Sequence, residues 1–287
     1  MTTMTRTAVN AQMQTSIYLK KPHVIMPYST LNQLHNILPN DVFSETEMPS
    51  MKYMAIGNKG HRSEAGIDGI SVTKAIPHET THTGMYNQLP FVLRLPTDDL
   101  TAIARAQYRL RKTVSINGVT YIAYYLRVLD LTDTIPKLEL RVTEDGVTTA
   151  TDFEFTPNSL RPTLPVIGTN QVLVTSGNAI ASTARITFKI TAEDAEELRS
   201  VARILYGDEN YAIVSELSPV TGIDRLTSGE VNGVPIQYHE VVGAQIASFM
   251  NTYYPFSILR NGAEIDLDIG NTEALLSLVD RSTIPTP

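Results

Sequence analysis

The sequence contains no cysteine and no tryptophan among its 287 residues. Without cysteine the chain can hold no disulfide, no cysteine-ligated zinc, no iron–sulfur cluster and no thiol nucleophile. Long apolar runs are also missing: none approaches the roughly 20 residues that a membrane-spanning helix needs, and the N-terminal segment has no apolar core of a secretory signal. We therefore expect a protein that is made and folded in a cytoplasm and has no membrane partner.

An excess of basic residues is absent too, because 23 Lys and Arg face 30 Asp and Glu and the net charge is −7. This balance gives no electrostatic footprint for nucleic acid. Hydrophobic residues make up 42% of the chain and charged residues only 18%. The low charged fraction suggests a surface that neighbouring chains cover. The length allows one large domain or two ordinary ones with a sizeable core.

The clearest structural signals in the sequence are those of turns. Asn-Gly pairs at 117–118, 232–233 and 261–262, and Asp145-Gly146, separate runs rich in β-branched and aromatic residues. Such pairs favour the positive φ angles of two-residue hairpins. Helical spacing with capping residues predicts short helices over 29–38, 98–112 and 192–206, and a further helical stretch near 243–251. The predicted fold class is α+β and β-rich, with antiparallel sheets, hairpins and a few short helices.

Composition shifts divide the chain into three predicted parts. Residues 1–50 form an N-terminal extension or docking arm, and its first 16 residues are polar and without period, so we expect them to be mobile until a neighbour orders them. Residues 51–165 form a central α+β domain that contains a long loop over 55–84. The prolines at 157, 162 and 165 mark a boundary, and residues 166–287 form a C-terminal α+β domain.

The string His78-Glu79-Thr80-Thr81-His82 fits H-E-x-x-H, the motif of zinc hydrolases. On a helix the two histidines would point the same way and bind zinc, with the glutamate polarising a metal-bound water. The surroundings disfavour that helix, since Pro77 precedes the string and two threonines lie inside it. We interpret it as a polar loop, with no catalytic, cofactor or metal residue assigned; a metal-dependent hydrolase using His78 and His82 is the alternative function.

Other basic and aromatic residues suit contacts better than chemistry. The turn at 57–62 exposes Lys and Arg beside two glycines, but no glycine there is followed by the Lys and Ser or Thr of a phosphate-binding loop. The arginines of 105–111 suit pairing with the carboxylates of a partner. We therefore take six residues as candidates for contact with other chains: His61, Arg62, Arg94, Arg105, Arg109 and Tyr124.

Residues of about 52–165 resemble a family of virion structural proteins from large contractile-tailed bacteriophages. This region is about two-fifths of the chain, and the resemblance lies in MAIGNKGHR, GIDGI, PHETTHTGMYNQLPFVLR, DDLTAIARAQYRLRK and INGVTYIAYYLRVLDL. The matching positions are Gly57, Asn58, Gly60, His61, Pro77, His78, Pro90, Phe91, Arg94, Asp99, Arg105, Tyr108, Arg111, Asn117, Gly118, Tyr124 and Tyr125.

This resemblance implies a structural subunit of the tail or baseplate. Its partners would be other virion proteins, in multiple copies per particle, with neither nucleic acid nor membrane among them. It implies no enzyme activity and no cofactor. It also implies a virion location, reached by assembly in the host cytoplasm.

Overall fold

The computed structural model describes residues 3–18, 21–26, 28–38, 47–160, 163–164, 166, 168–231 and 233–280. The chain forms two compact units, each built from two separate segments. Unit 1 comprises Met1–Asp130 and Lys189–Glu264, and unit 2 comprises Leu131–Phe188 and Ile265–Pro287. The boundaries predicted at 50 and 165 are corrected by this division. The chain leaves unit 1 and returns to it, and the proline-rich segment belongs to unit 2.

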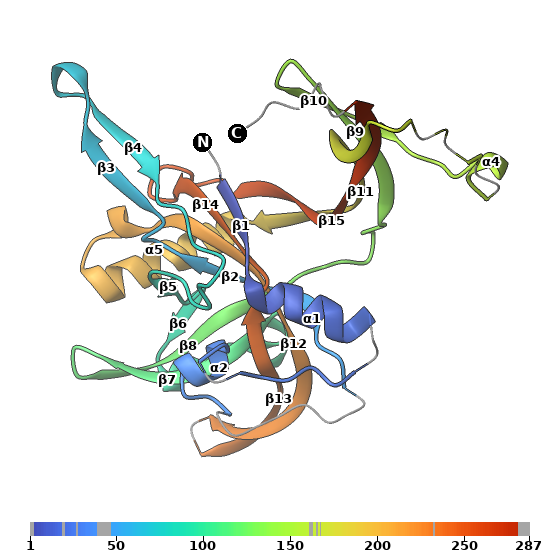
Figure 1. Cartoon of the computed structure of the whole chain (residues 1–287). Helices are drawn as coiled ribbons and strands as arrows, with labels where there is room; N and C mark the ends of the chain where they lie inside the picture. The colour runs from blue at the N-terminus through green and yellow to red at the C-terminus, as the bar shows by residue number, and fades with distance from the viewer. Residues whose placement is uncertain are drawn as a thin grey trace. The chain divides into compact units, whose positions relative to one another are not determined.

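Unit 1 is built on one antiparallel sheet, which we call the main sheet (Figure 1). Its strands are β1 (Thr3–Arg6), β2 (Ser50–Gly57), β5 (Gln88–Leu89), β6 (Val92–Arg94), β7 (Tyr108–Ile116), β8 (Val119–Val128), β12 (Ile213–Val231), β13 (Val234–Ile246) and β14 (Ser248–Pro255). They follow the order β1-β14-β12-β2-β8-β6, with β13 on β12, β5 on β2 and β7 on β8. Strand β12 connects the sheet, because its first half pairs with β14 and β2 and its second half with β13.

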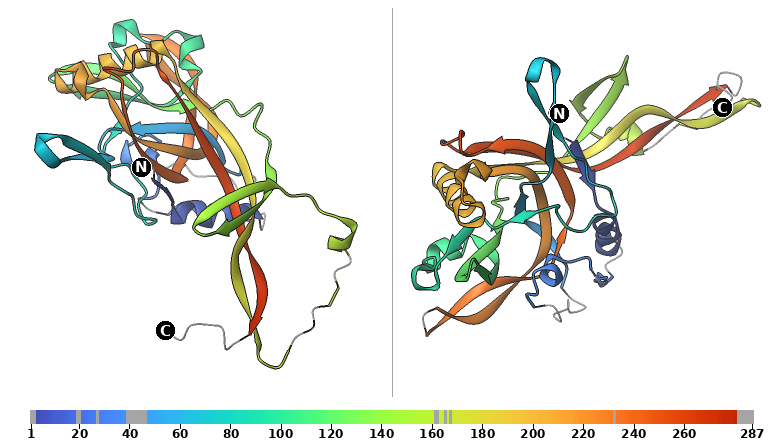
Figure 2. Two further views of the ribbon diagram at one scale, coloured as in Figure 1. Left: turned by 90° about the horizontal axis from the view of Figure 1, so that it is seen from above. Right: turned by 90° about the vertical axis from the view of Figure 1, so that its left-hand side faces the viewer.

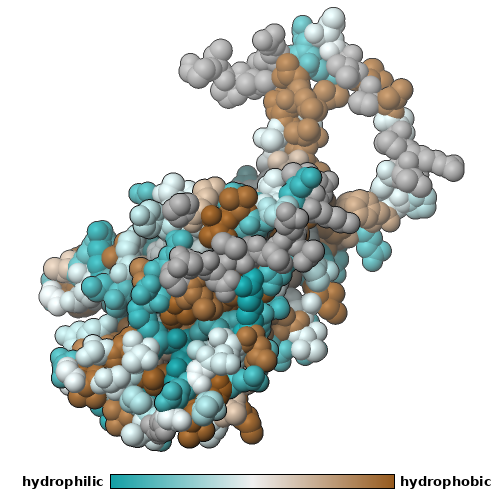
Figure 3. Space-filling model, turned by 90° about the horizontal axis from the view of Figure 1, so that it is seen from below, coloured by the Kyte–Doolittle hydropathy of each residue, from teal (hydrophilic) through white to brown (hydrophobic). Residues whose placement is uncertain are grey.

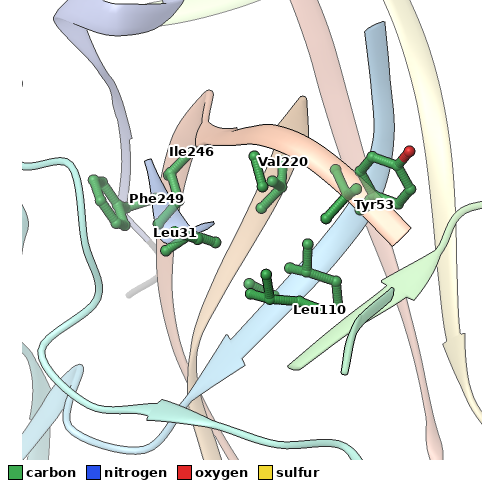
Figure 4. Close-up of a cluster of buried hydrophobic side chains, with 10 residues drawn as sticks. Leu31, Tyr53, Leu110, Val220, Ile246 and Phe249 are labelled. Carbon is green, nitrogen blue, oxygen red and sulfur yellow. The ribbon is translucent and has the colours of Figure 1, made fainter. Parts of the chain in front are cut away.

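The core of unit 1 lies against β12 and its neighbours (Figure 4). Its members come from segments far apart in the sequence and are at most 1% exposed: Leu31, Tyr53, Leu110, Val220, Ile246 and Phe249 are among them. Burying each such side chain contributes about 1.5–3 kcal/mol relative to its exposure to water. The burial of these side chains against β12 therefore stabilises the pairing of strands that are far apart in the sequence.

The Asn117-Gly118 hairpin forms as predicted. Both residues have positive φ, 51° and 78°, and Ile116 pairs with Val119 across the turn. The turn predicted at Asp145-Gly146 also forms, with φ of 49° and 78°. Asn232 lies outside the described residues, although Gly233 has the positive φ, 77°, that such a turn requires.

Two of the predicted helices are confirmed. Helix α2 (Leu31–Leu34) begins at Thr30, whose hydroxyl accepts from the Gln33 N–H. Helix α5 (Ala192–Tyr206) has a capping box between Thr191 and Asp194 and ends at Gly207, with φ 77°. Its apolar face reaches the main sheet where Val201 packs with Leu93 and Ala123. A short 3-10 turn, η3 (Glu209–Tyr211), follows it.

The N-terminal residues form regular structure, which corrects the mobile arm predicted for 1–16. Over the described part, β1 pairs with β14, and α1 (Ala8–Tyr18) follows. The Thr7 hydroxyl donates to the Ile246 carbonyl at 2.7 Å, and the Met13 side chain is buried. A polar composition did not reveal these contacts, because β1 obtains its stability from backbone pairing with a strand some 245 residues away.

The helix predicted over 98–112 is wrong. That segment contains η2 (Pro96–Asp98), α3 (Ala102–Arg105) and the start of β7. The helical stretch near 243–251 is also wrong, because those residues belong to β13 and β14. The hairpin predicted at 261–262 does not form either, since β14 and the strand after the turn enter different sheets. In each case strand pairing overrides the local pattern.

The loop predicted over 55–84 is partly structured. Strands β3 (His61–Ala65) and β4 (Ser71–Ala75) form a two-stranded ribbon joined by η1 (Ile67–Gly69). Residues 76–87 carry no helix or strand. This irregular segment contains the His-Glu-Thr-Thr-His string and passes over β12.

Unit 2 contains a separate antiparallel sheet, the second sheet, with the order β10-β9-β11-β15. Its elements are β9 (Lys137–Glu144), β10 (Val147–Asp152), the turn of helix α4 (Pro157–Leu160), β11 (Gln171–Ile190) and β15 (Ala263–Asp280). Strands β11 and β15 run side by side as a long twisted pair (Figure 2). The fold class is thus α+β and β-rich, as predicted. Among the described residues no helix is both long and apolar enough to cross a membrane.

Candidate functional site

A buried cluster of polar groups in unit 1 surrounds Glu216 in β12. This residue stands opposite Gly57 of β2 and Asn251 of β14, and its side chain is 0% exposed. A carboxylate in such a place is costly unless its oxygens find partners. The segments 58–60 and 76–87 cover it and provide these partners.

Four groups approach the Glu216 carboxylate. His78 Nε2 lies 2.8 Å from Oε1, and the Tyr86 N–H donates to the same oxygen at 2.8 Å. The N–H groups of Lys59 and Asn87 donate to Oε2 at 3.2 and 3.4 Å. One buried side chain thereby fixes two irregular segments to the central strand of the sheet.

The His78 ring is enclosed by aromatic rings. It stacks on Phe249 with centroids 3.8 Å apart and on Tyr86 with centroids 4.1 Å apart, at interplanar angles of 10° and 19°. The side chain is 0% exposed. A substrate therefore has no access to this imidazole.

His82 makes two contacts through its Nδ1 atom. His82 Nδ1 accepts from the Glu79 N–H at 3.3 Å and lies 3.0 Å from His78 Nδ1. An Nδ1 that accepts from the backbone carries no proton, so His78 Nδ1 is the donor to it.

Close packing around Glu216 explains two glycines of the 57–62 turn. A Cβ added at Gly57 would lie 2.6 Å from Glu216 Oε2, and one at Gly60 would lie 2.5 Å from Glu216 Cγ. Distances below 3 Å leave no room for a side chain. The glycines let the backbone approach the buried carboxylate, and no anion cradle is needed to explain them.

The string at 78–82 does not form the arrangement that its zinc motif requires. It lies in an irregular segment, and both nitrogens of His78 face protein groups. Across the described residues there is no group of three histidine or acidic side chains placed to hold a metal ion. The helix on which an H-E-x-x-H zinc site depends is therefore not present in the described segment.

A second buried cluster centres on Asp99, whose side chain is 1% exposed. Its carboxylate accepts from the Tyr124 hydroxyl at 2.7 Å and from Arg111 Nη2 at 3.1 Å, and Arg105 Nη2 lies 3.8 Å away. Burial and the hydrogen bond to Asp99 raise the pKa of Tyr124 to about 12. Tyr124 therefore remains a hydrogen-bond donor at any ordinary pH.

A third cluster joins β2, β7 and β12. Asp224 accepts from the Tyr53 hydroxyl at 2.6 Å and from Arg109 Nε and Nη2 at 2.7 and 3.2 Å. Burial by itself would raise the pKa of Asp224, but the hydrogen bonds from Arg109 and Tyr53 outweigh it and lower that pKa. The carboxylate thus stays ionised and links three strands.

Glu240 in β13 supports the unusual backbone of β7. Its carboxylate accepts from the N–H groups of Leu110 at 2.6 Å, Arg111 at 2.9 Å and Val241 at 2.8 Å. Leu110 has a positive φ of 57°, which is costly for a residue with a branched side chain. Burial raises the pKa of Glu240, although these donors favour its ionised form.

The six contact candidates fall into different environments. Arg105, Arg109 and Tyr124 are buried within the chain, so their assignment to an interface is corrected. Arg94 is mostly covered and pairs with Glu197. His61 is half-buried with its ring edge against Tyr253, and burial lowers its pKa. Arg62 remains exposed, 2.6 Å from Glu64.

The acceptors Glu216, Asp224 and Glu240 were not predicted from the sequence. Glu216 and Glu240 lie in β-prone runs of the sequence and Asp224 lies between these runs, and no role was assigned to any of the three. The signal was a carboxylate inside an apolar β run, as in IVSEL and HEVV. Such a residue faces either solvent or a buried donor, and only long-range pairing shows which.

These contacts define a class: an antiparallel α+β protein whose buried histidine, arginine and carboxylate groups fix its own loops and strands. The chain belongs to a family of unknown function, DUF7208, whose model matches residues 1–282. It matches no curated protein and no solved structure.

Proposed function

We propose that this chain is a structural subunit of a bacteriophage virion, in the baseplate or wedge of a contractile tail. It would act through contacts with other virion proteins, in multiple copies per particle, and would reach the virion by assembly in the host cytoplasm. The resemblance of residues 52–165 to virion structural proteins supports a place in the virion. The exposed apolar residues of the second sheet support contacts with other protein chains.

The second sheet carries the proposal, because it has almost no core of its own. In the described part of unit 2 the buried residues lie within 181–188 and 265–267: Ala181, Thr183, Ile186, Phe188, Ile265 and Leu267. Strands β9 and β10 contain no buried residue. A free sheet without a covered apolar face is at best marginally stable in water.

Apolar side chains remain at the surface of this sheet (Figure 3). Leu275 and Leu276 are consecutive in β15 and 36% and 59% exposed. Consecutive residues of a strand point to opposite faces, so apolar surface lies on both faces. Leu173 of β11 and Val147 of β10 are exposed as well. Cover on both faces is what a position inside a protein assembly would provide.

The residues of the resemblance support a structural role over a catalytic one. Gly57, Gly60 and His78 surround Glu216, while Arg105, Arg111 and Tyr124 surround Asp99. All of these contacts stabilise the fold, and the His78 ring and the Asp99 carboxylate are withdrawn from solvent. A shared pattern made of such residues would preserve a shape that neighbours recognise.

The composition of purified particles tests this proposal. Mass spectrometry of virions from the phage that encodes this chain should find it at several copies per particle, whereas phage proteins made only for replication should be absent. A cryo-electron microscopy map should then show protein density against both faces of the second sheet. Infectious particles without the chain would overturn the proposal.

A further inference from the structure

Strand β10 is an edge of the second sheet without the usual protection against pairing. All six of its residues are exposed, and along the described sheet only β9 pairs with it. Edge strands of proteins are commonly blocked by lysine, proline, a bulge or a covering element. The β10 sequence VTTATD has neither lysine nor proline, its register with β9 is continuous, and threonine and valine favour strands.

The hairpin geometry determines which backbone groups face outward. Glu144 and Val147 close the two-residue turn, and the Phe153 N–H donates to the Leu138 carbonyl at 2.9 Å. Pairs that exchange backbone hydrogen bonds alternate with pairs that do not. Residues 147, 149, 151 and 153 therefore bond toward β9. Thr148, Ala150 and Asp152 direct their N–H and C=O groups to the free edge.

We propose that β10 is a self-association edge, which pairs antiparallel with β10 of a second copy of this chain. A two-fold axis at Ala150 would place Ala150 opposite itself, Thr148 opposite Asp152 and Thr149 opposite Thr151. This register uses every outward backbone group, and three bonded pairs exchange about six hydrogen bonds. The second sheets of two copies would become one continuous sheet.

The distribution of charge favours a second copy of this chain as the partner of β10, and it favours β10 over the opposite edge of the second sheet. The only charge on β10 is Asp152, which lies 3.6 Å from Lys137 of the adjacent strand and would meet a threonine of the other copy. No like charges face each other in this register. The opposite edge, β15, carries five carboxylates and no cation: Glu264, Asp266, Asp268, Glu273 and Asp280. Pairing two copies through β15 would therefore bring carboxylates together.

The inference goes beyond the proposed function, because it requires only a second copy and no other virion protein. A pairing through six residues buries little surface, so we expect it to be weak in dilute protein. A covalent trap, in which engineered cysteines of two paired copies form a disulfide, can detect such a weak contact. The chain contains no cysteine, so engineered cysteines report on this edge alone.

The trap is a Thr149→Cys, Thr151→Cys double variant of the full chain, oxidised with glutathione disulfide. The proposed register places each cysteine opposite its counterpart in a pair without backbone bonds, where side chains are closest. We expect most of the protein to become a covalent dimer. A Ser71→Cys, Thr73→Cys variant on the exposed strand β4 is the matched control for random collision and should give several-fold less dimer.

Addition of Ala150→Pro to the trap should abolish the dimer. It removes one outward N–H and leaves the bonds to β9 intact, and proline is tolerated on edge strands. Ala150→Lys, which places two cations on the axis, should do the same if proline disturbs the hairpin; circular dichroism checks the fold of both. A dimer yield equal to the β4 control, or a yield unchanged by both Ala150 variants, would overturn the proposal. Higher covalent polymers would do so too, because a two-fold contact closes after two copies.

Discussion

A carboxylate inside a strand is stable only when its oxygens are fully engaged, and β12 and β13 contain several such residues. Glu216 holds irregular segments, Asp224 links strands and Glu240 supports the backbone of β7. Each accepts at least two hydrogen bonds from groups distant in sequence. At this scale the ionisable residues of the main sheet serve the fold.

Glu216→Gln should destabilise the chain, because an amide presents an NH₂ group to donors that need an acceptor. One buried donor loses its partner, which costs about 1–3 kcal/mol in the free energy of unfolding. Urea denaturation followed by circular dichroism measures this. Glu79→Gln, at a side chain 78% exposed in the same loop region, is the control and should change stability by less than about 0.5 kcal/mol. Equal midpoints for the two variants would contradict the role of Glu216.

Tyr124→Phe should lower stability by about 1.5–3 kcal/mol, since it removes the hydrogen bond to the charged Asp99 carboxylate. Tyr121→Phe, on the same strand and less buried, should have a smaller effect. The free energy of unfolding of both variants in urea decides this. Equal stability of Tyr124→Phe and the wild type would show that the Asp99 cluster contributes little.

Single residues were predicted unevenly from the sequence. The short helices within 29–38 and 192–206 were predicted correctly, because helix caps depend on the few residues next to them; the structure has Thr30, Thr191 and Gly207 at these caps. The burial of Arg105, Arg109 and Tyr124 was missed, since their partners Asp99 and Asp224 can be recognised only once β7, β8 and β12 are placed.

The helices and strands also divide into those determined by neighbouring residues and those determined by distant ones. The hairpin at Asn117-Gly118 and helix α5 were predictable, because turn geometry and helix amphipathicity are properties of consecutive residues. The spacing of apolar residues predicts the end of a helix at 108–112, yet these residues belong to β7. Pairing with β8 and the Glu240 carboxylate impose the extended backbone there.

Gly118→Val should strain the turn that fixes the register of β7 and β8. Gly118 has φ 78°, and a residue with a Cβ loses about 1–2 kcal/mol in a left-handed conformation. Thermal or urea unfolding should show that loss. Gly84→Ala is the control, because its φ is not in the left-handed range and an added Cβ would meet only Leu34, at 3.9 Å. A stability of Gly118→Val equal to that of the control would mean that the turn tolerates another conformation.

The two units differ in how much of their surface they bury. Unit 1 has a core of aromatic and aliphatic side chains that are almost completely buried. In the described part of unit 2, most of β9, β10 and the first half of β11 remains exposed or half-buried. The sequence did not reveal this division, because each unit is assembled from segments on either side of the other.

Hydrogen exchange of the isolated chain should therefore separate the two sheets. Backbone amides open with free energies between zero and that of global unfolding, and few buried contacts place a segment near the lower end. We expect amides of 137–152 to exchange at least about tenfold faster than those of 213–222, which run through the core. Mass spectrometry of peptic fragments measures both segments in one sample. Assembly with other copies or virion proteins should slow the exchange of 137–152 and leave 213–222 unchanged, since new neighbours would cover the exposed second sheet, whereas 213–222 is already largely buried. If both segments are equally protected in dilute isolated protein, the second sheet is stable without cover, and the main support for an assembly role is lost.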